Sequence, residues 1–218
     1  MTKYRSLPTL SDMLPRLIIF DLDGCLWTTE MKFLSTLPQR IDGHVQATES
    51  FAGKFGESRI PHKTINIDLH PGARLALRTV RDDPTFRDVR LSCASKTWKV
   101  DYSHACLDAL HVDGESVGGM LSKDARQIYP KTKDHHLSML YHATGIAYRD
   151  MLFFDDCTWR DNFADVRTLE GGEDVTCILT ADGLSIDLWH KGLQMHATAR
   201  LAPSRTLRLH SILECEVR

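Results

Sequence analysis

LIIFDLDGCLW, at residues 17–27, is the stretch that decides the fold. It opens with apolar residues rich in β-branched and aromatic types, a pattern that predicts a buried strand. Because side chains two apart along a strand share a face, Asp21 and Asp23 start on the same side of it. Two close carboxylates repel each other, and burial also removes their hydration. A hard divalent cation such as Mg2+ offsets both effects, because it takes carboxylate and carbonyl oxygens as ligands.

The composition is that of an ordinary globular chain. The 218 residues are 42% hydrophobic and 26% charged, which is typical of soluble proteins, and we predict a single α/β domain over residues 1–218. The formal net charge of −2 gives no reason to expect a nucleic-acid or membrane partner. No apolar run approaches the ~20 residues that cross a bilayer.

The cysteines and the first residues of the chain indicate the cellular compartment in which the protein works. The six cysteines show no paired Cys-x-x-Cys spacing, which predicts free thiols in a reducing environment. The first eight residues lack the apolar core of a secretory signal. We therefore expect a cytoplasmic protein, and a monomer.

Strands and helices alternate along the chain. Apolar runs predict strands at residues 17–23, 89–95, 150–156 and 175–179, and residues 117–121 fit a further short strand. Helical periods predict helices at about 97–110, 133–143, 159–169 and 184–199, and one that has Pro71 in its first turn and ends at 82–84. The inner sides of the 133–143 and 184–199 helices would carry Leu137, Leu140, Tyr141, Leu184, Leu188, Leu193 and Met195. This alternation favours an α/β fold with a parallel sheet and helices on both faces.

Residues 28–67 interrupt the alternation. They carry several glycines and prolines, mixed charges and only short apolar runs, and no helical period is sustained there. A span of this length without clear elements is more typical of a functional lid than of an ordinary connection. We expect a loop or a small β-rich flap at 28–67, beside the first carboxylates.

Polar residues occupy the ends of several predicted strands and the start of one helix. They are Asp21, Asp23, Ser95, Lys133, Asp155 and Asp156. Asp-Leu-Asp-Gly alone fits a strand that ends in a turn, but ligands of open parallel sheets bind outside the carboxyl ends of the strands. The set supplies a nucleophile, a hydroxyl donor, a cation and metal-ligating carboxylates, which is what phosphoryl transfer needs.

The order of these motifs resembles the haloacid dehalogenase (HAD) superfamily. More narrowly, the chain is similar to the magnesium-dependent phosphatase-1 family in Phe20-Asp21-Leu22-Asp23-x-x-Leu26-Trp27, Ala94-Ser95-Lys96-Thr97, Ile128-Tyr129-Pro130-x-x-Lys133 and Phe153-Phe154-Asp155-Asp156. The resemblance covers about residues 17–197. It implies a Rossmann-like, three-layer fold with a parallel central sheet and a small cap.

The resemblance also implies a role for each residue. Asp21 would be the nucleophile, and Asp23 would be the general acid for the leaving group and then the general base for water. Ser95 and Lys133 would bind the phosphoryl group. The ligands that it implies for Mg2+ are Asp21, the backbone carbonyl of Asp23, Asp156 and, beside it, Asp155.

Some residues depart from the family's pattern or carry a second interpretation. Gly24-Cys25 stands where Tyr-Thr is usual, and Cys157 where an acidic residue is common. Asp155 could orient its neighbours rather than bind metal, and Ser95 could also cap the helix that begins near Thr97. We interpret Trp27 as a packing residue near the site. We expect five other side chains to face solvent: Lys96, Lys123, Lys131, His135 and His136.

The predicted function is a Mg2+-dependent phosphomonoesterase that acts through an aspartyl-phosphate. The family suggests phosphotyrosine or sugar phosphates as substrates, in a phosphorylated small molecule or a phosphoprotein. A minimal flap at 28–67 would leave the site open to bulky esters. One alternative is a phosphatase of the same superfamily that acts on nucleic-acid ends or phosphoserine. Another is a catalytically weak metal-binding or regulatory module, which the weaker hydrogen-bonding capacity of a thiol at Cys25 favours.

Overall fold

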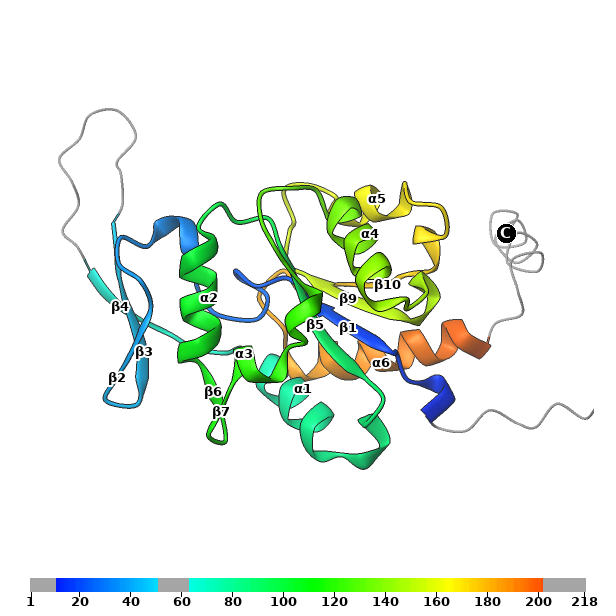
Figure 1. Cartoon of the computed structure of the whole chain (residues 1–218), viewed down its shortest axis with the longest axis horizontal. Helices are drawn as coiled ribbons and strands as arrows, with labels where there is room; N and C mark the ends of the chain where they lie inside the picture. The colour runs from blue at the N-terminus through cyan, green and yellow to red at the C-terminus, as the bar shows by residue number, and fades with distance from the viewer. Residues whose placement is uncertain (1–10, 51–62, 202–218) are drawn as a thin grey trace, which may run out of the picture.

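A five-stranded parallel sheet forms the centre of the computed structural model, which describes residues 11–50 and 63–201 (Figure 1). The strand order is β10-β9-β1-β5-β8, and neighbouring strands pair in parallel. The strands are β1 (Leu17–Phe20), β5 (Arg90–Ser95), β8 (Arg126–Ile128), β9 (Met151–Asp155) and β10 (Thr176–Leu179). The parallel sheet and α/β class predicted from the sequence are confirmed.

The register of the sheet aligns the ends of the central strands. Phe20, the last residue of β1, lies opposite Cys93 of β5 and Phe154 of β9. The ladder continues one residue further, because the backbone N–H of Asp21 donates to the carbonyl of Phe154 at 2.8 Å. The acidic residues that follow β1 and β9 therefore leave the sheet at the same level.

Helices cover both faces of the sheet, which makes the predicted three layers (Figure 1). One face packs on α1 (Pro71–Asp82) and α6 (Ile186–Leu201), and the other on α4 (Lys133–Thr144) and α5 (Asn162–Arg167). Side chains of β1 alternate between them: Ile18 points to the first face and Ile19 to the second. β1 is thus buried on both sides, as its unbroken apolar run predicts.

The insertion after β1 is a small antiparallel sheet. It consists of β2 (Gln39–Ile41), β3 (His44–Glu49) and β4 (Lys63–Ile67) in the order β2-β3-β4. It packs beside α2 (Val100–Ala109), where Arg40 donates to the carbonyl of Ala109. The β-rich character expected of residues 28–67 is confirmed in their described part, and residues 51–62 lie outside it.

Some elements differ from the sequence prediction. Residues 117–121 form a short helix, α3 (Val117–Met120), whose first turn is capped by Ser116, which accepts from the N–H of Gly119. A hairpin of β6 (His111–Val112) and β7 (Glu115–Ser116) was not predicted, nor was β8. Asp113 and Gly114 join this hairpin with positive φ values of 50° and 92°, the conformation that an Asp-Gly hairpin turn requires.

Two predicted inward-facing side chains are exposed. Tyr141 is 40% exposed and stacks on Tyr148 with ring centroids 5.2 Å apart, and Met195 is 43% exposed. The buried side of α4 differs from its apolar pattern, because Leu137 and Leu140 share it with Lys133 and His136. Short 3-10 turns complete the fold: η1 (Ser11–Met13), η2 (Met31–Phe33), η3 (Pro84–Phe86), η4 (Lys123–Ala125), η5 (Tyr148–Asp150) and η6 (Gly172–Asp174).

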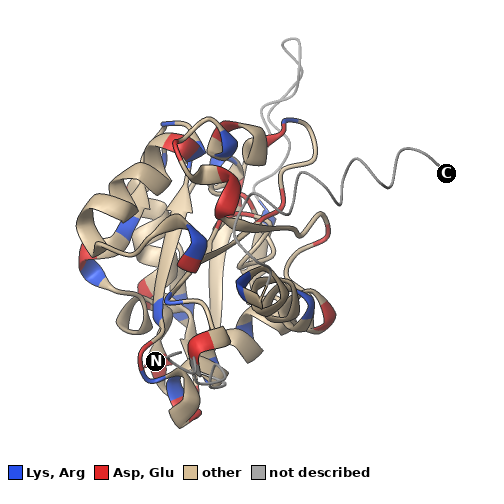
Figure 2. Cartoon of the chain, turned by 90° about the vertical axis from the view of Figure 1, so that its right-hand side faces the viewer, with Lys and Arg blue, Asp and Glu red and all other residues tan. Residues whose placement is uncertain are grey.

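Charges of both signs are interspersed along the elements (Figure 2). Within residues 11–50 and 63–201, no helix combines the length and the apolar character that crossing a membrane requires. The tail after Pro203, including Cys215, lies outside the described residues.

Candidate active site

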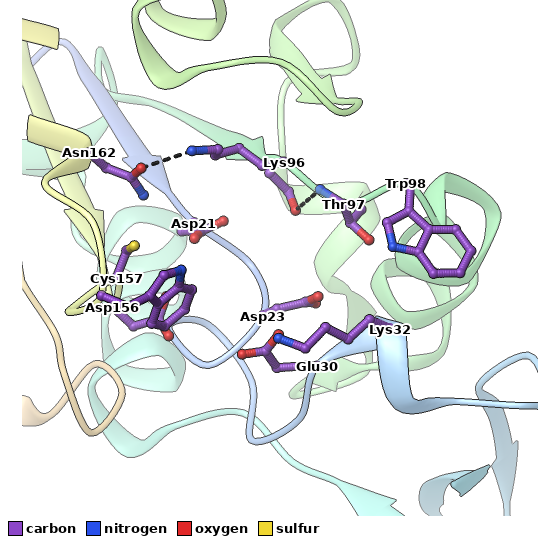
Figure 3. A pocket seen from close by; sticks show the side chains of 12 residues that line it. Asp21, Asp23, Glu30, Lys32, Lys96, Thr97, Trp98, Asp156, Cys157 and Asn162 are labelled. Carbon is purple, nitrogen blue, oxygen red and sulfur yellow. Dashed lines mark hydrogen bonds and ion pairs between the residues drawn. The ribbon is translucent and has the colours of Figure 1, made fainter. Parts of the chain in front are cut away.

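A cavity of about 240 Å3 lies at the carboxyl ends of β1, β5 and β9. Its position matches the prediction from the parallel sheet. Figure 3 shows the side chains that line it. They are Asp21, Asp23, Glu30, Lys32, Ser95, Lys96, Thr97, Trp98, Asp156, Cys157, Trp159 and Asn162.

Three predicted carboxylates meet beside this cavity. Asp21, Asp155 and Asp156 each offer an oxygen within 4.8 Å of the others. Burial, together with the neighbouring carboxylates, raises the pKa of Asp21 to about 6, although Lys133 lowers it, and raises the pKa of Asp156 to about 7. An oxygen-only donor set with excess negative charge fits a hard divalent cation such as Mg2+.

Lys133 is the cation beside these carboxylates. It begins α4, is fully buried, and contacts Asp21 Oδ1 and Asp155 Oδ2 at 3.0 Å each. Its ammonium also donates to the carbonyl of Ala94 at 2.6 Å. Burial alone would lower the pKa of Lys133, but the two carboxylates outweigh it and raise that pKa. Lys133 therefore stays charged and holds the nucleophile candidate in place.

The two acidic residues after β9 have different environments. Asp155 accepts from the N–H of Cys157 at 2.9 Å and from Asn162 Nδ2 at 3.0 and 3.1 Å, in addition to its contact with Lys133. Asp156 lines the cavity, whereas Asp155 does not. This geometry fits Asp156 as a direct metal ligand and Asp155 as an orienting group, and both roles stay predictions.

Asp23 faces the cavity from the loop after β1. Its Oδ1 accepts from the indole Nε1 of Trp27 at 3.0 Å, and its Oδ2 accepts from the N–H of Met31 at 2.9 Å. Burial raises the pKa of Asp23 to about 7, although both donors lower it. Trp27 is fully buried, as predicted, and also orients this carboxylate. The metal contact implied for the backbone carbonyl of Asp23 stays a prediction.

Gly24, a departure from the family pattern, has a geometric reason here. Its φ is +74°, and a Cβ at this position would lie 2.4 Å from Oδ2 of Asp156. The absence of a side chain therefore makes room for the metal-ligand candidate. Cys25, which follows it, is fully buried, and burial raises the pKa of its thiol.

Ser95 and Lys96 enter the cavity from the end of β5. Ser95 is 2% exposed, and its Oγ accepts from the N–H of Thr97 at 3.4 Å. The prediction that Ser95 caps the following helix is wrong, because α2 begins only at Val100. Lys96 is only partly exposed, not solvent-facing as predicted: it lines the cavity, and its Nζ donates to Asn162 Oδ1 at 3.0 Å (Figure 3).

His136 corrects a further prediction. It is fully buried, and its Nε2 lies 3.0 Å from the carbonyl of Tyr129. Burial lowers its pKa to about 3. The loop that precedes α4 folds back over this side chain, whereas His135, Lys123 and Lys131 are exposed as expected.

Several residues of the site were missed from the sequence. Asn162 binds Asp155 and Lys96 at once, but its sequence position marks it only as the start of a helix. Glu30 and Lys32 form an ion pair of 2.5 Å at the cavity. Trp98 and Trp159, which are 66% and 71% exposed, also line it. No local pattern distinguishes these residues from ordinary loop residues, because sheet topology brings them together.

Comparisons with known proteins show which family the chain is similar to. The family model described as Acid Phosphatase matches residues 13–199. The human protein named Magnesium-dependent phosphatase 1 is 29% identical over 195 residues, which cover 88% of this chain and 93% of that protein. A HAD-like hydrolase superfamily protein of Schizosaccharomyces pombe is 27% identical over 144 residues, which cover 65% of this chain and 76% of that protein.

Proposed function

Because the chain belongs to the acid phosphatase family, we propose that it is a Mg2+-dependent phosphatase that hydrolyses phosphomonoesters through an aspartyl-phosphate on Asp21. The observation that carries the proposal is the meeting of Asp21, Asp155 and Asp156 around one point, with Lys133 beside them. The human relative's name attributes magnesium dependence to that protein. The oxygen donors here suit the same ion.

Asp21 is the proposed nucleophile. The N–H of Leu22 donates to its Oδ1 at 2.8 Å, and Lys133 approaches the same oxygen at 3.0 Å. These contacts fix the carboxylate at the cavity wall. In the proposed first step an oxygen of Asp21 bonds to phosphorus while the ester P–O bond breaks. Mg2+, when bound, would neutralise charge on the phosphoryl oxygens.

Asp23 is the proposed acid and base. Its pKa of about 7 leaves it protonated often enough near neutral pH to give its proton to the departing alkoxide. The resulting carboxylate then takes a proton from water, whose oxygen attacks phosphorus. Inorganic phosphate leaves, and the carboxylate of Asp21 is restored. Ser95 and Lys96, which line the same cavity, are proposed to bind phosphoryl oxygens, and the phosphate-binding role of Lys133 stays a prediction.

The proposal is tested with p-nitrophenyl phosphate. We expect Mg2+-dependent release of p-nitrophenol that fluoroberyllate inhibits. Asp21→Asn should lower the rate of this release by at least about a thousandfold. Circular dichroism and thermal unfolding verify that the variant is folded. Absence of turnover by folded wild-type protein with Mg2+ present would contradict the proposal and favour a metal-binding regulatory module.

The substrate class within this proposal is phosphotyrosine or sugar phosphates. Turnover of a phosphotyrosine peptide is compared with that of small sugar phosphates at equal Mg2+. A clear preference for the sugars would reject a site open to bulky esters. Phosphoserine peptides and 5′-phosphorylated oligonucleotides in the same assay test the alternatives within the superfamily.

A further inference from the structure

Two exposed indoles line the candidate active site. Trp98 and Trp159 are 66% and 71% exposed, and both line the cavity that contains Asp21 and Asp23. Neither belongs to the hydrophobic clusters that hold the sheet and helices together. Aromatic side chains that line a cavity together with a few polar groups are typical of a ligand-binding site.

The indoles come from loops that follow two different strands. Trp98 lies between β5 and α2, and Trp159 lies between β9 and α5. In Figure 3, Trp98 lies on one side of the cavity, and Asp156 and Cys157, from the loop that carries Trp159, lie on the other. The same loops carry Ser95 and Asp156, so the indoles have a fixed relation to the reacting centre.

Each indole also has an ammonium against its ring. Lys99 Nζ lies 5.4 Å from the ring centroid of Trp98, and Lys32 Nζ lies 5.8 Å from that of Trp159. Lys32 is held in turn by Glu30 at 2.5 Å, and Lys99 by the carbonyl of Leu34. These cation–π contacts restrict the rings and reduce the entropy that a ligand would otherwise lose on ordering them.

The size of the cavity determines what reaches the indoles. It measures about 240 Å3, less than the roughly 300–1,000 Å3 of pockets that enclose a small-molecule ligand. Trp98 and Trp159 line the same cavity as Asp21, so the rest of an ester whose phosphoryl group lies at Asp21 extends toward the indoles. The groups it meets there include two flat, π-rich surfaces.

We propose that Trp98 and Trp159 bind the leaving group of the substrate and select esters that carry a planar aromatic ring. This inference rests on the proposed phosphatase function, because it places the phosphoryl group at Asp21. Aromatic rings stack on indole with a preference of about two- to tenfold over their saturated equivalents per contact. Saturated rings gain only the hydrophobic part of that interaction.

Benzyl phosphate and cyclohexylmethyl phosphate test the proposal. Both release a primary alcohol of similar size, and they differ in whether the ring is planar. We expect wild-type protein to have the lower KM for benzyl phosphate. Trp98→Ala and Trp159→Ala should each raise that KM about two- to tenfold, with a smaller effect on kcat. They should raise the KM for cyclohexylmethyl phosphate by a smaller factor, because the saturated ring loses only the hydrophobic part of the contact. Trp98→Phe and Trp159→Phe should retain part of the preference.

Tyr141→Ala is the matched control, because Tyr141 is an exposed aromatic residue that does not line this cavity. Equal KM values for the two esters in wild-type protein, or an unchanged ratio in both alanine variants, would overturn the inference while phosphatase activity stands. Calorimetric binding of benzylphosphonate and cyclohexylmethylphosphonate separates the two proposals. Absence of p-nitrophenyl phosphate turnover defeats the phosphatase proposal, whereas equal or absent phosphonate binding overturns the indole site.

Discussion

Trp27 donates its indole N–H to Oδ1 of Asp23 at 3.0 Å, so a fully buried core residue helps to orient the candidate acid and lowers its pKa against the larger, raising effect of burial. Trp27→Phe removes that donor and keeps most of the packing. A donor to a carboxylate favours its charged form, so its loss raises the pKa of Asp23. We expect the alkaline limb of kcat/KM to move up by roughly half to one pH unit.

Trp189→Phe is the control for this pH profile, because Trp189 is equally buried and packs on Phe154 without contacting a carboxylate of the site. Both variants should lose stability, and the control should leave the alkaline limb in place. An unchanged limb in Trp27→Phe would show that another group titrates there.

Gly24→Ala should disturb Asp156. Alanine at a φ of +74° lowers the free energy of unfolding by about 1–2 kcal/mol. Its Cβ would lie 2.4 Å from Oδ2 of Asp156, so the carboxylate would have to move. Gly43→Ala has the same backbone problem, at a φ of +85°, with nothing within 4 Å of the added Cβ. Both variants should unfold at lower temperature. The Mg2+ concentration for half-maximal activity should rise, by about tenfold or more, only in Gly24→Ala.

His136 makes stability depend on acid pH. Its folded-state pKa of about 3 lies below the ordinary value of 6.5, so folding favours the neutral ring. The stability that this provides is complete above pH 6.5 and is lost as the pH falls toward 3. His136→Gln keeps an N–H for the carbonyl of Tyr129 and cannot titrate.

The free energy of unfolding of His136→Gln, measured by urea titration from pH 7 to pH 4, should therefore fall less steeply than that of wild-type protein. The difference is at most about 1.4 kcal/mol per pH unit. His135→Gln changes the exposed neighbour and should reproduce the wild-type slope. A wild-type slope in both variants would assign the acid sensitivity to other groups.

Replacing Lys133 should mainly lower stability, whereas replacing Lys96 should mainly lower activity. Lys133→Met leaves Asp21 and Asp155 buried without their cation, which costs about 3–5 kcal/mol of unfolding free energy in metal-free protein. Lys96→Met, at a partly exposed side chain, should change stability little and lower kcat/KM. Chemical unfolding in EDTA and turnover in Mg2+ measure the two effects. A Lys133→Met protein as stable as wild type would contradict the ion-pair assignment.

The sequence predicted the parts of this molecule that depend on local pattern. The apolar run of β1 and its carboxylates marked the sheet and one end of the site, and the order of motifs marked the family, which the comparisons confirm. The short elements were harder: α3 contains Gly118 and Gly119 and is held by a side-chain cap, and β8 has three residues. Such segments are determined by their neighbours more than by their own propensity.

The rest of the site depends on long-range placement. Lys96 and Asn162 are 66 positions apart and meet only because β5 and β9 flank β1. His136 looked solvent-facing beside His135, but it is covered by the loop at Tyr129. Neither relationship has a counterpart in residue spacing along the chain.

The hydrogen bond from the N–H of Asp21 to the carbonyl of Phe154 affects how the candidate active site withstands heating. It makes the nucleophile candidate the last rung of the central ladder, so its amide proton should exchange with deuterated solvent as slowly as those of β1 itself. Loosening of the surrounding loops on heating would then leave Asp21 in position. Heat inactivation should coincide with melting of the whole sheet.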